Sequence, residues 1–155
     1  MSETKVLIIA AGLGSRMSDL THDKPKCMVD FHGKTLLQRQ LESYQDAGLS
    51  EFALVRGYKK EQINYPGITY FENDDFKNNN ILCSMFYAEA FLEGDVVVGY
   101  SDILFDADIV SKLLATKDDI AIVVDTDWQD YYIGRVDHPI SEAENVIFDE
   151  NKNVV

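Results

Sequence analysis

The most restrictive feature of the sequence is an uninterrupted apolar run near its start, Val6-Leu7-Ile8-Ile9-Ala10. Strands with one solvated face alternate apolar and polar residues, whereas a continuous run with β-branched residues is typical of a strand buried on both faces. Such strands occur mainly in parallel sheets that carry helices on both sides. The run continues directly into a glycine-containing loop over residues 11–17. The start of the chain therefore predicts a layered α/β domain.

Predicted strands and helices alternate along the rest of the chain. Apolar residues recur at helical spacing from Thr35 to Ala47, and Gly48 suits the position that follows a helix. Further strands are expected at 52–55, 69–72, 95–100 and 120–125, and further helices at 59–64, 81–92 and 106–115. This order favours a Rossmann-like three-layer α/β/α domain over residues 1–155 with a mostly parallel central sheet.

The C-terminal residues predict an incomplete hairpin. Residues 146–148 have the character of a strand, 149–153 of a turn, and 154–155 of the start of a returning strand. We therefore expect a chain that is truncated at its C-terminus.

Composition excludes several classes of function. The chain has 155 residues, of which 46% are hydrophobic, enough for one core. Its 27 acidic and 14 basic side chains give a net charge of -13, which disfavours binding to nucleic acids or to anionic membranes. Residues 1–60 hold 9 basic and 7 acidic side chains, whereas residues 61–155 hold 5 and 20. This distribution fits a small anion, such as a phosphate, bound near the N-terminal loop.

Cysteine use and the N-terminus bear on localisation. Cys27 and Cys83 are far apart and form no Cys-x-x-Cys pattern, which predicts neither a disulfide framework nor a zinc ribbon. The apolar run at residues 5–11 is much shorter than a membrane span, and residues 1–5 have no signal-peptide character. We expect a cytoplasmic protein.

The loop Ala11-Gly12-Leu13-Gly14-Ser15-Arg16 suits phosphate binding, because glycines let the backbone approach a ligand and present its N–H groups. Two common phosphate-binding loops do not fit. A dinucleotide fingerprint needs a third glycine where Met17 stands and an acidic residue where Arg56 stands. A P-loop needs Gly-Lys followed by Ser or Thr. What remains is Gly-x-Gly-Ser-Arg, followed by Lys24-Pro25-Lys26.

This combination resembles the N-terminal signature of nucleotidyltransferases that join an NTP to a phosphorylated small molecule. The resemblance extends through the strand-like residues 28–31 and Gly33-Lys34 into the following helix. Residues 79–84, Asn-Asn-Ile-x-x-Ser, and residues 96–102, Val-Val-Val-Gly-Tyr-Ser-Asp, are similar to the cytidylyltransferases for phosphocholine, aminoalkylphosphonates or phosphoglutamine. The resemblance implies that residues 1–155 are a nucleotidyltransferase domain, with the NTP-binding region and part of the acceptor-binding region.

The resemblance implies roles for charged residues and for the loop. Arg16 would contact the triphosphate and Lys26 the α-phosphate, whereas Lys24 is a weaker match. Asp102 would bind Mg²⁺, and the family's second metal-binding aspartate would come from beyond Val155. As alternatives, the cations are solvated surface residues and Asp102 is a loop residue bonded to nearby backbone. The expected nucleotide-binding residues of the loop are Ala11, Gly12, Gly14 and Ser15.

Neutral and aromatic residues complete the predicted site. Asn80 and Ser84 would read the base and ribose, with Asn79 as a substitute; the alternative is capping of the helix that follows. Tyr58 would line the base side of the pocket or pack in the core. The predicted acceptor-binding residues, which would otherwise fill the core or face water, are Trp128, Tyr131 and Arg135.

The sequence thus favours an Mg²⁺-dependent enzyme that transfers CMP from CTP to a phosphorylated or phosphonate small molecule, with release of pyrophosphate. One alternative is a sugar-1-phosphate nucleotidyltransferase that uses UTP or dTTP. Another is a nucleotide-binding module without catalytic activity.

Overall fold

The computed structural model describes residues 4–14, 18–135 and 139–155. Residues up to Leu114 form one compact unit and residues from Ala115 a second, and each is described by itself. The assignment of a single domain to the chain stays a prediction. Among the described residues, no helix is long and apolar enough to cross a membrane. The first unit contains β1 (Lys5–Ala10), α1 (Ser18–Thr21), β2 (Asp30–Phe31), β3 (Lys34–Thr35), α2 (Leu36–Asp46), β4 (Phe52–Arg56), β5 (Ile68–Glu72), α3 (Ile81–Phe86), β6 (Val96–Tyr100) and α4 (Ala107–Leu114).

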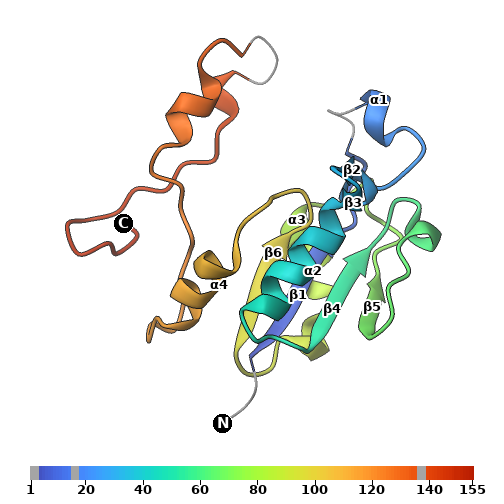
Figure 1. The fold of residues 1–155 in the computed structure, drawn as a ribbon, viewed down its shortest axis with the longest axis horizontal. Helices are drawn as coiled ribbons and strands as arrows, with labels where there is room; N and C mark the ends of the chain where they lie inside the picture. Colours follow the sequence, from blue (N-terminus) through green and yellow to red (C-terminus); the bar gives the residue numbers. More distant parts are fainter. Residues whose placement is uncertain (1–3, 15–17, 136–138) are drawn as a thin grey trace. The chain divides into compact units, whose positions relative to one another are not determined.

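A four-stranded parallel sheet forms the centre of the first unit (Figure 1), in the order β5-β4-β1-β6. Val6 of β1 pairs with Phe52 of β4 and Val97 of β6, so the first strand of the chain lies between partners from much later in the sequence. The carboxyl ends of all four strands therefore meet at one edge of the sheet, where ligands bind in folds of this class.

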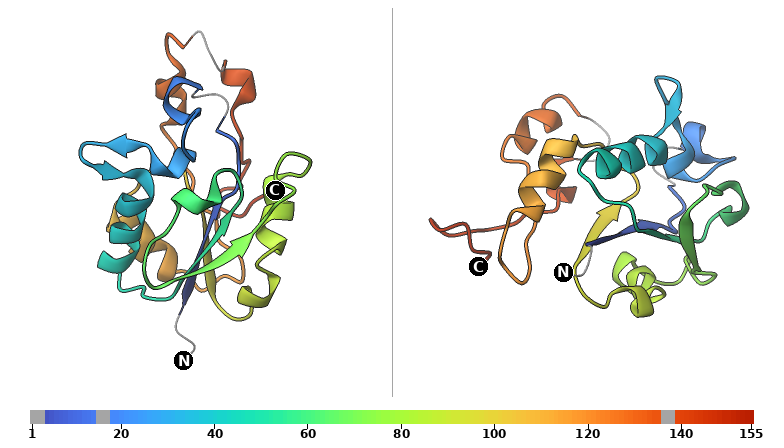
Figure 2. Two further views of the ribbon diagram at one scale, coloured as in Figure 1. Left: turned by 90° about the vertical axis from the view of Figure 1, so that its right-hand side faces the viewer. Right: turned by 60° about the horizontal axis from the view of Figure 1, so that its bottom comes forward.

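The two faces of the sheet are covered by different helices. Val6, Ile8 and Ala10 belong to the core cluster that includes α2 and Val110 of α4. Leu7 belongs to the second cluster, which includes Phe91. Figure 2 shows α2 and α3 on opposite sides of the sheet. This arrangement explains why β1 is apolar at every position from Val6 to Ala10, and it confirms the predicted α/β/α layers.

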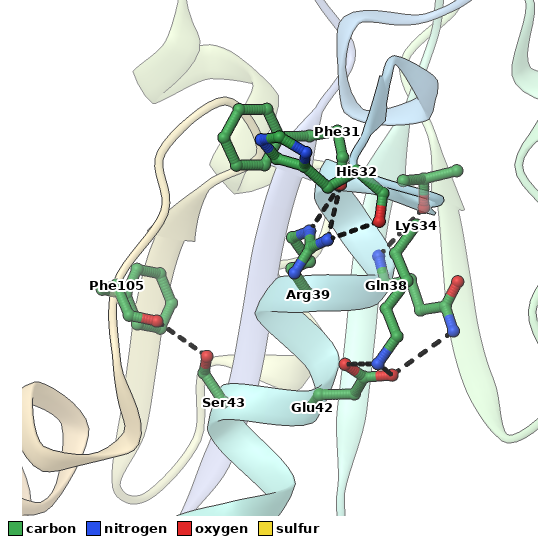
Figure 3. Close-up of polar contacts among 9 residues, drawn as sticks. Phe31, His32, Lys34, Gln38, Arg39, Glu42, Ser43 and Phe105 are labelled. Carbon is green, nitrogen blue, oxygen red and sulfur yellow. Dashed lines mark hydrogen bonds and ion pairs between the residues drawn. The ribbon is translucent and has the colours of Figure 1, made fainter.

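Helix α2 begins and ends as its sequence predicts. The Thr35 hydroxyl accepts a hydrogen bond from the Gln38 N–H at 3.0 Å, and Gly48 has a positive φ of 90° after the last turn. Arg39 of α2 donates from Nε and Nη2 to the Phe31 carbonyl at 2.8 and 2.6 Å. These bonds hold the small β2–β3 hairpin on the helix (Figure 3).

The helix predicted over 81–92 is wrong in its second half. α3 ends at Phe86, and a separate 3-10 helix spans Glu89–Phe91. The Tyr87 and Ala88 amides bond three residues back, to the Ser84 and Met85 carbonyls, which tightens the chain at this point. The three-residue period puts Ala88 and Phe91 on the same side, where both are buried against the sheet.

Other 3-10 helices span short segments of both units. In the first unit, two of them lie at Lys26–Met28 and Lys60–Gln62; the second falls within the helix predicted at 59–64. In the second unit they lie at Trp128–Tyr132 and Ile140–Glu142.

The strand predicted at 120–125 is also wrong. A strand exists only where a neighbour completes its hydrogen-bond ladder, and no described residue pairs with this segment. Ile120 and Ile122 are 86% and 58% exposed. At the C-terminus, the predicted turn forms because Asp149 accepts bonds from the amides of Asn151 and Asn153. The strands expected beside it reduce to one bridge between Phe148 and Val154.

Candidate active site

A cavity of about 290 Å³ opens at the carboxyl edge of the sheet, within the first unit. It is enclosed by the ends of β1 and β6, the loop after β1, the start of α3 and Lys26. Because parallel strands end at the same edge, residues from distant parts of the chain converge here. Its lining residues are Ile9, Ala10, Ala11, Gly12, Leu13, Gly14, Lys26, Phe76, Asn79, Asn80, Ile81, Ser84, Tyr100, Ser101 and Asp102.

Gly14 fits closely between two neighbours at the mouth of the cavity. Its φ is 63°, and a Cβ at this position would lie 3.2 Å from Cβ of Lys26. The Thr21 hydroxyl donates to the Gly14 carbonyl at 2.8 Å, which fixes the loop. Ala11, Gly12 and Gly14 line the cavity as the sequence predicts. Ser15 and Arg16 lie outside the described residues, so their roles stay predictions.

A second glycine, Gly57, allows the loop after β4 to approach the loop after β1. A Cβ at Gly57 would lie 2.8 Å from the carbonyl oxygens of both Ala11 and Asn73. The Tyr58 N–H donates to the Ala11 carbonyl at 3.1 Å. The backbone of the loop after β1 is therefore tied to the ends of β4 and β5 at a distance that only glycine permits.

The structure brings together Lys26 and Asp102, which are 76 residues apart in sequence. The ammonium donates to the carboxylate at 2.7 Å, and the two side chains are 26% and 35% exposed. Asp102 directly follows Ser101, whose N–H bonds to the Ile9 carbonyl at 3.2 Å as the ladder between β1 and β6 ends. A cation and a carboxylate, paired with each other, thus line the same cavity.

A buried network of amide side chains supports the part of the cavity wall that the start of α3 forms. Asn73 is fully buried, and its Nδ2 donates to Asn79 Oδ1 at 3.0 Å and to Ser84 Oγ at 2.9 Å. Asn79 Nδ2 returns a bond to Asn73 Oδ1 at 3.1 Å. The sequence analysis did not single out Asn73, although a polar residue directly after a strand of this sheet was a usable signal. Its contacts connect the end of β5 with the start of α3.

Asn80 caps α3, as the alternative interpretation of this residue expects. Its Oδ1 accepts from the Cys83 N–H at 2.9 Å, while Ser84 Oγ donates to the Asn80 carbonyl at 3.2 Å. Asn80 is exposed and lines the cavity, whereas Ser84 is only 5% exposed. Capping and ligand binding are compatible for Asn80, because its amide nitrogen is separate from the capping oxygen.

Two other predicted residues lie beside the cavity rather than in its lining. Tyr58 donates from its hydroxyl to the His22 carbonyl at 2.8 Å and packs edge-on against Phe76. Lys24 lies 4.0 Å from Asp23 and is 41% exposed. Tyr58 therefore fixes the loop around His22, and Lys24 is a surface cation.

The predicted acceptor residues belong to the second unit, where the structure describes them among themselves. Trp128 packs edge-on against Tyr132 with ring centroids 5.7 Å apart. The Arg135 guanidinium lies over the Tyr132 ring at 4.8 Å, and Tyr131 is 64% exposed. Trp128, Tyr131 and Arg135 therefore gather around one short segment, and their contact with an acceptor stays a prediction.

Among the described residues that line the cavity, Asp102 is the one carboxylate. The described part of the chain contains no group of three histidine, cysteine or acidic residues placed to hold a metal. Mg²⁺ in nucleotide sites is commonly held by one or two carboxylates together with phosphates and water. Asp102 therefore fits as a single protein ligand for a metal that arrives with a nucleotide.

The fold and the site together define a domain of the Rossmann-like α/β class, with a cavity and a glycine-containing loop at the carboxyl edge of a parallel sheet. Residues 6–146 match the family model of the MobA-like NTP transferase domain. The chain belongs to this family, which confirms the predicted resemblance.

Individual relatives include both cytidylyltransferases and sugar-phosphate enzymes. The chain is 33% identical over 151 residues to the CTP:phosphoglutamine cytidylyltransferase of Campylobacter jejuni, covering 90% of this chain and 60% of that protein. It is 29% identical over 136 residues to the UTP–glucose-1-phosphate uridylyltransferase of Haloferax volcanii, covering 81% and 56%.

A solved structure supports the same relationship. The CTP:phosphocholine cytidylyltransferase of Streptococcus pneumoniae matches with a TM-score of 0.62 and 30% identity, over 68% of this chain and 50% of that one. The chain thus spans between half and about three fifths of the length of these three proteins.

Proposed function

We propose that this chain carries the NTP-binding part of a cytidylyltransferase. In the proposed reaction, an oxygen of an acceptor phosphate or phosphonate attacks the α-phosphorus of CTP. A new P–O bond forms, the bond between the α-phosphorus and the bridging oxygen breaks, and pyrophosphate leaves with the electron pair. Such transfers need positioning and charge neutralisation from the protein rather than covalent catalysis.

The observation that carries the proposal is the Lys26–Asp102 pair beside the glycine loop in one cavity. Without a nucleotide, the Lys26 ammonium neutralises the Asp102 carboxylate. A bound triphosphate would offer the ammonium a more highly charged partner, so Lys26 would turn to the α-phosphate and leave Asp102 available. The positive charge of the Lys26 ammonium would stabilise the negative charge that develops on the phosphoryl oxygens in the transition state.

Asp102 is the residue that would hold Mg²⁺, together with phosphate oxygens of the nucleotide. The bound metal would supply further charge neutralisation at the phosphates. The cavity wall opposite Lys26 offers Asn80 and Ser84 for the base and ribose. In the same proposal, Ser15 and Arg16 contact the triphosphate, and Trp128, Tyr131 and Arg135 contact the acceptor.

Preference for CTP is supported by relatives that are named as CTP-dependent enzymes. The relative that is named as UTP-dependent supports the second candidate, a sugar-1-phosphate nucleotidyltransferase. A nucleotide-binding module without turnover is the third candidate, because among the described residues that line the cavity Asp102 is the one carboxylate.

A thermal-shift titration with CTP, UTP, dTTP and ATP, each with Mg²⁺ or with EDTA, tests the proposal. A ligand at about 100 times its Kd stabilises the folded state by roughly 2.7 kcal/mol, which raises the Tm of a chain this size by about 5 to 10 °C. We expect the largest shift with CTP and Mg²⁺. A larger shift with UTP or dTTP would favour the sugar-phosphate enzyme, and no shift with any nucleotide would contradict the proposal.

A further inference from the structure

Gln40 is a buried glutamine in the middle of α2, and its side chain reaches the segment that presents Asp102. Only 1% of its surface is exposed. Its Nε2 donates to the Tyr100 carbonyl at 2.7 Å and to the Ile103 carbonyl at 2.6 Å. These two carbonyls immediately flank Ser101 and Asp102, so one amide group holds both ends of the turn.

The Tyr100 carbonyl has a physical reason to need this donor. The Ser101 N–H bonds to Ile9 of β1, and the carbonyl of the same peptide points the opposite way, toward the open side of β6. Among the described strands, β6 is the last of the sheet on that side. Gln40 therefore replaces the neighbouring strand that this carbonyl would otherwise need.

The contacts also fix which way the Gln40 amide points. Both hydrogens of Nε2 are used, and Oε1 is buried without a hydrogen-bond partner among the described residues. The reverse orientation would place Oε1 against two carbonyl oxygens, which repel it. The protein thus accepts the free-energy cost of an unpaired buried acceptor while it keeps both donors on the turn.

Neighbouring side chains of α2 hold the same segment. Ser43, one turn after Gln40, donates from Oγ to the Phe105 carbonyl at 2.7 Å (Figure 3). A Cβ on Gly99 would collide with the Tyr44 hydroxyl, so α2 approaches β6 closely. Residues 99–105 are therefore attached to α2 at several points, and Gln40 contacts those nearest to Asp102.

We propose that Gln40 is a positioning residue for Asp102: its two hydrogen bonds hold the Ser101–Asp102 turn so that the carboxylate faces the cavity beside Lys26. This inference rests on the proposed function, because it makes Gln40 necessary for metal-dependent nucleotide binding. Gln40 is not one of the residues that line the cavity. Its effect passes through the backbone of the turn.

The test compares Gln40→Leu with the wild-type chain and with Gln45→Leu, a matched control at an exposed glutamine of the same helix. Calorimetric titration measures the Kd for CTP in Mg²⁺ and in EDTA. We expect Gln40→Leu to lose about tenfold or more of the affinity that Mg²⁺ adds, with little change in EDTA, because residues that orient a metal ligand have effects of this size. Gln45→Leu should match the wild type.

Hydrogen–deuterium exchange of residues 99–105 gives a readout that needs no nucleotide. Faster exchange in Gln40→Leu than in Gln45→Leu supports the positioning role, and equal exchange together with an unchanged effect of Mg²⁺ overturns it. A wild-type chain that binds no nucleotide would instead refute the proposed function. The role of Gln40 in nucleotide binding would then be refuted as well. The two failures are therefore distinguishable.

If Gln40→Leu does not fold, Gln40→Glu provides a second test through its pH dependence. When the introduced carboxyl is protonated, it donates one hydrogen bond to the turn, and when ionised it donates none. We expect the effect of Mg²⁺ on CTP affinity, relative to the wild type at each pH, to recover as the pH is lowered. If Mg²⁺ raises the CTP affinity of Gln40→Glu by the same factor as that of the wild type at every pH, the proposal is contradicted.

Discussion

In the proposed function, the Lys26–Asp102 ion pair serves two states of the site, without and with a nucleotide. Each side chain is about a third exposed or less, so the pair is solvated enough to open and contributes little to folding stability. Its value lies in its place, because both groups line the cavity at the carboxyl edge of the sheet. A pair that separates at low cost can exchange its partners for a nucleotide and a metal.

We predict that Lys26→Ala lowers turnover about 100- to 1000-fold, because it removes a preorganised cation that opposes transition-state charge. Binding of CTP should weaken much less, since the glycine loop remains. Pyrophosphate release, measured with phosphocholine, phosphoglutamine and aminoethylphosphonate as acceptors, and the Kd for CTP together check this. Lys24→Ala is the matched control, because Lys24 is a surface cation 4.0 Å from Asp23. Unchanged turnover in Lys26→Ala would refute the role of Lys26.

The resemblance to nucleotidyltransferases singles out Lys26, Asp102 and Asn80 from the sequence. The structure places all three in the cavity lining, and their roles stay predictions. Gln40 and Asn73 were missed because their importance depends on contacts with residues that local pattern does not pair with them. In the sequence, Gln40 is one polar residue among several in an amphipathic helix. Its partners are the carbonyls of Tyr100 and Ile103, 60 and 63 residues away, and only the structure identifies them.

At the scale of elements, close contacts between loops set the shape of the cavity. Gly57 lies at the point where the chain after β4 meets the carbonyls of Ala11 and Asn73. The loop after β1 and the loop before α3 are both placed by this contact. The cavity therefore depends on the absence of one side chain as well as on the presence of others.

We predict that Gly57→Ala destabilises the fold by about 2 kcal/mol, because the added Cβ must displace backbone rather than a flexible side chain. Urea unfolding followed by circular dichroism measures this loss. Gly12→Ala is the control, since a Cβ at Gly12 would meet nothing within 4 Å. Equal losses in the two variants would show that the close approach at Gly57 is not the cause.

The elements that were predicted correctly are those whose own sequence pattern shows which of their faces must be buried. The apolar run at 6–10 and the amphipathic helix that begins after Thr35 are examples, because each needs burial wherever it lies. The segment 120–125 has the pattern of a strand but no partner in the described part of the chain, and pairing cannot be read from the segment alone. The division of 81–92 into two helices depends on how Ala88 and Phe91 pack against the sheet.

At the scale of the whole molecule, acidic residues outnumber basic ones, and among the described residues Lys60 and Arg56 join a small network with two carboxylates. Lys60 donates to Glu72 at 2.7 Å and to Asp74 at 2.6 Å, and Arg56 also donates to Glu72. Bonding to Lys60, and then to Arg56, lowers the pKa of Glu72. Bonds from Asp74 and Glu72 raise the pKa of Lys60.

We predict that the free energy of unfolding decreases as the pH falls below about 4.5, the ordinary value for glutamate. A carboxylate whose folded pKa is lowered stabilises the fold fully above its unfolded pKa, and this contribution disappears as the pH falls through the folded pKa. Glu42, whose pKa is lowered by its bond from Lys34, adds to the effect. Urea unfolding at a series of pH values between about 3 and 7 measures how steeply the free energy of unfolding changes with pH. Glu72→Gln should make the slope shallower, and an unchanged slope would contradict the assignment.

The central position of β1 has a consequence for synthesis on the ribosome. β1 leaves the exit tunnel first, yet its partner β4 ends at Arg56 and its other partner β6 ends at Tyr100. The most apolar strand of the protein is therefore unpaired on one side until about two thirds of this chain has been made. Non-local parallel pairing of this kind is slow, and it leaves apolar segments open to aggregation while it is incomplete. Aggregation during synthesis is therefore the risk that comes with placing this strand at the centre of the sheet.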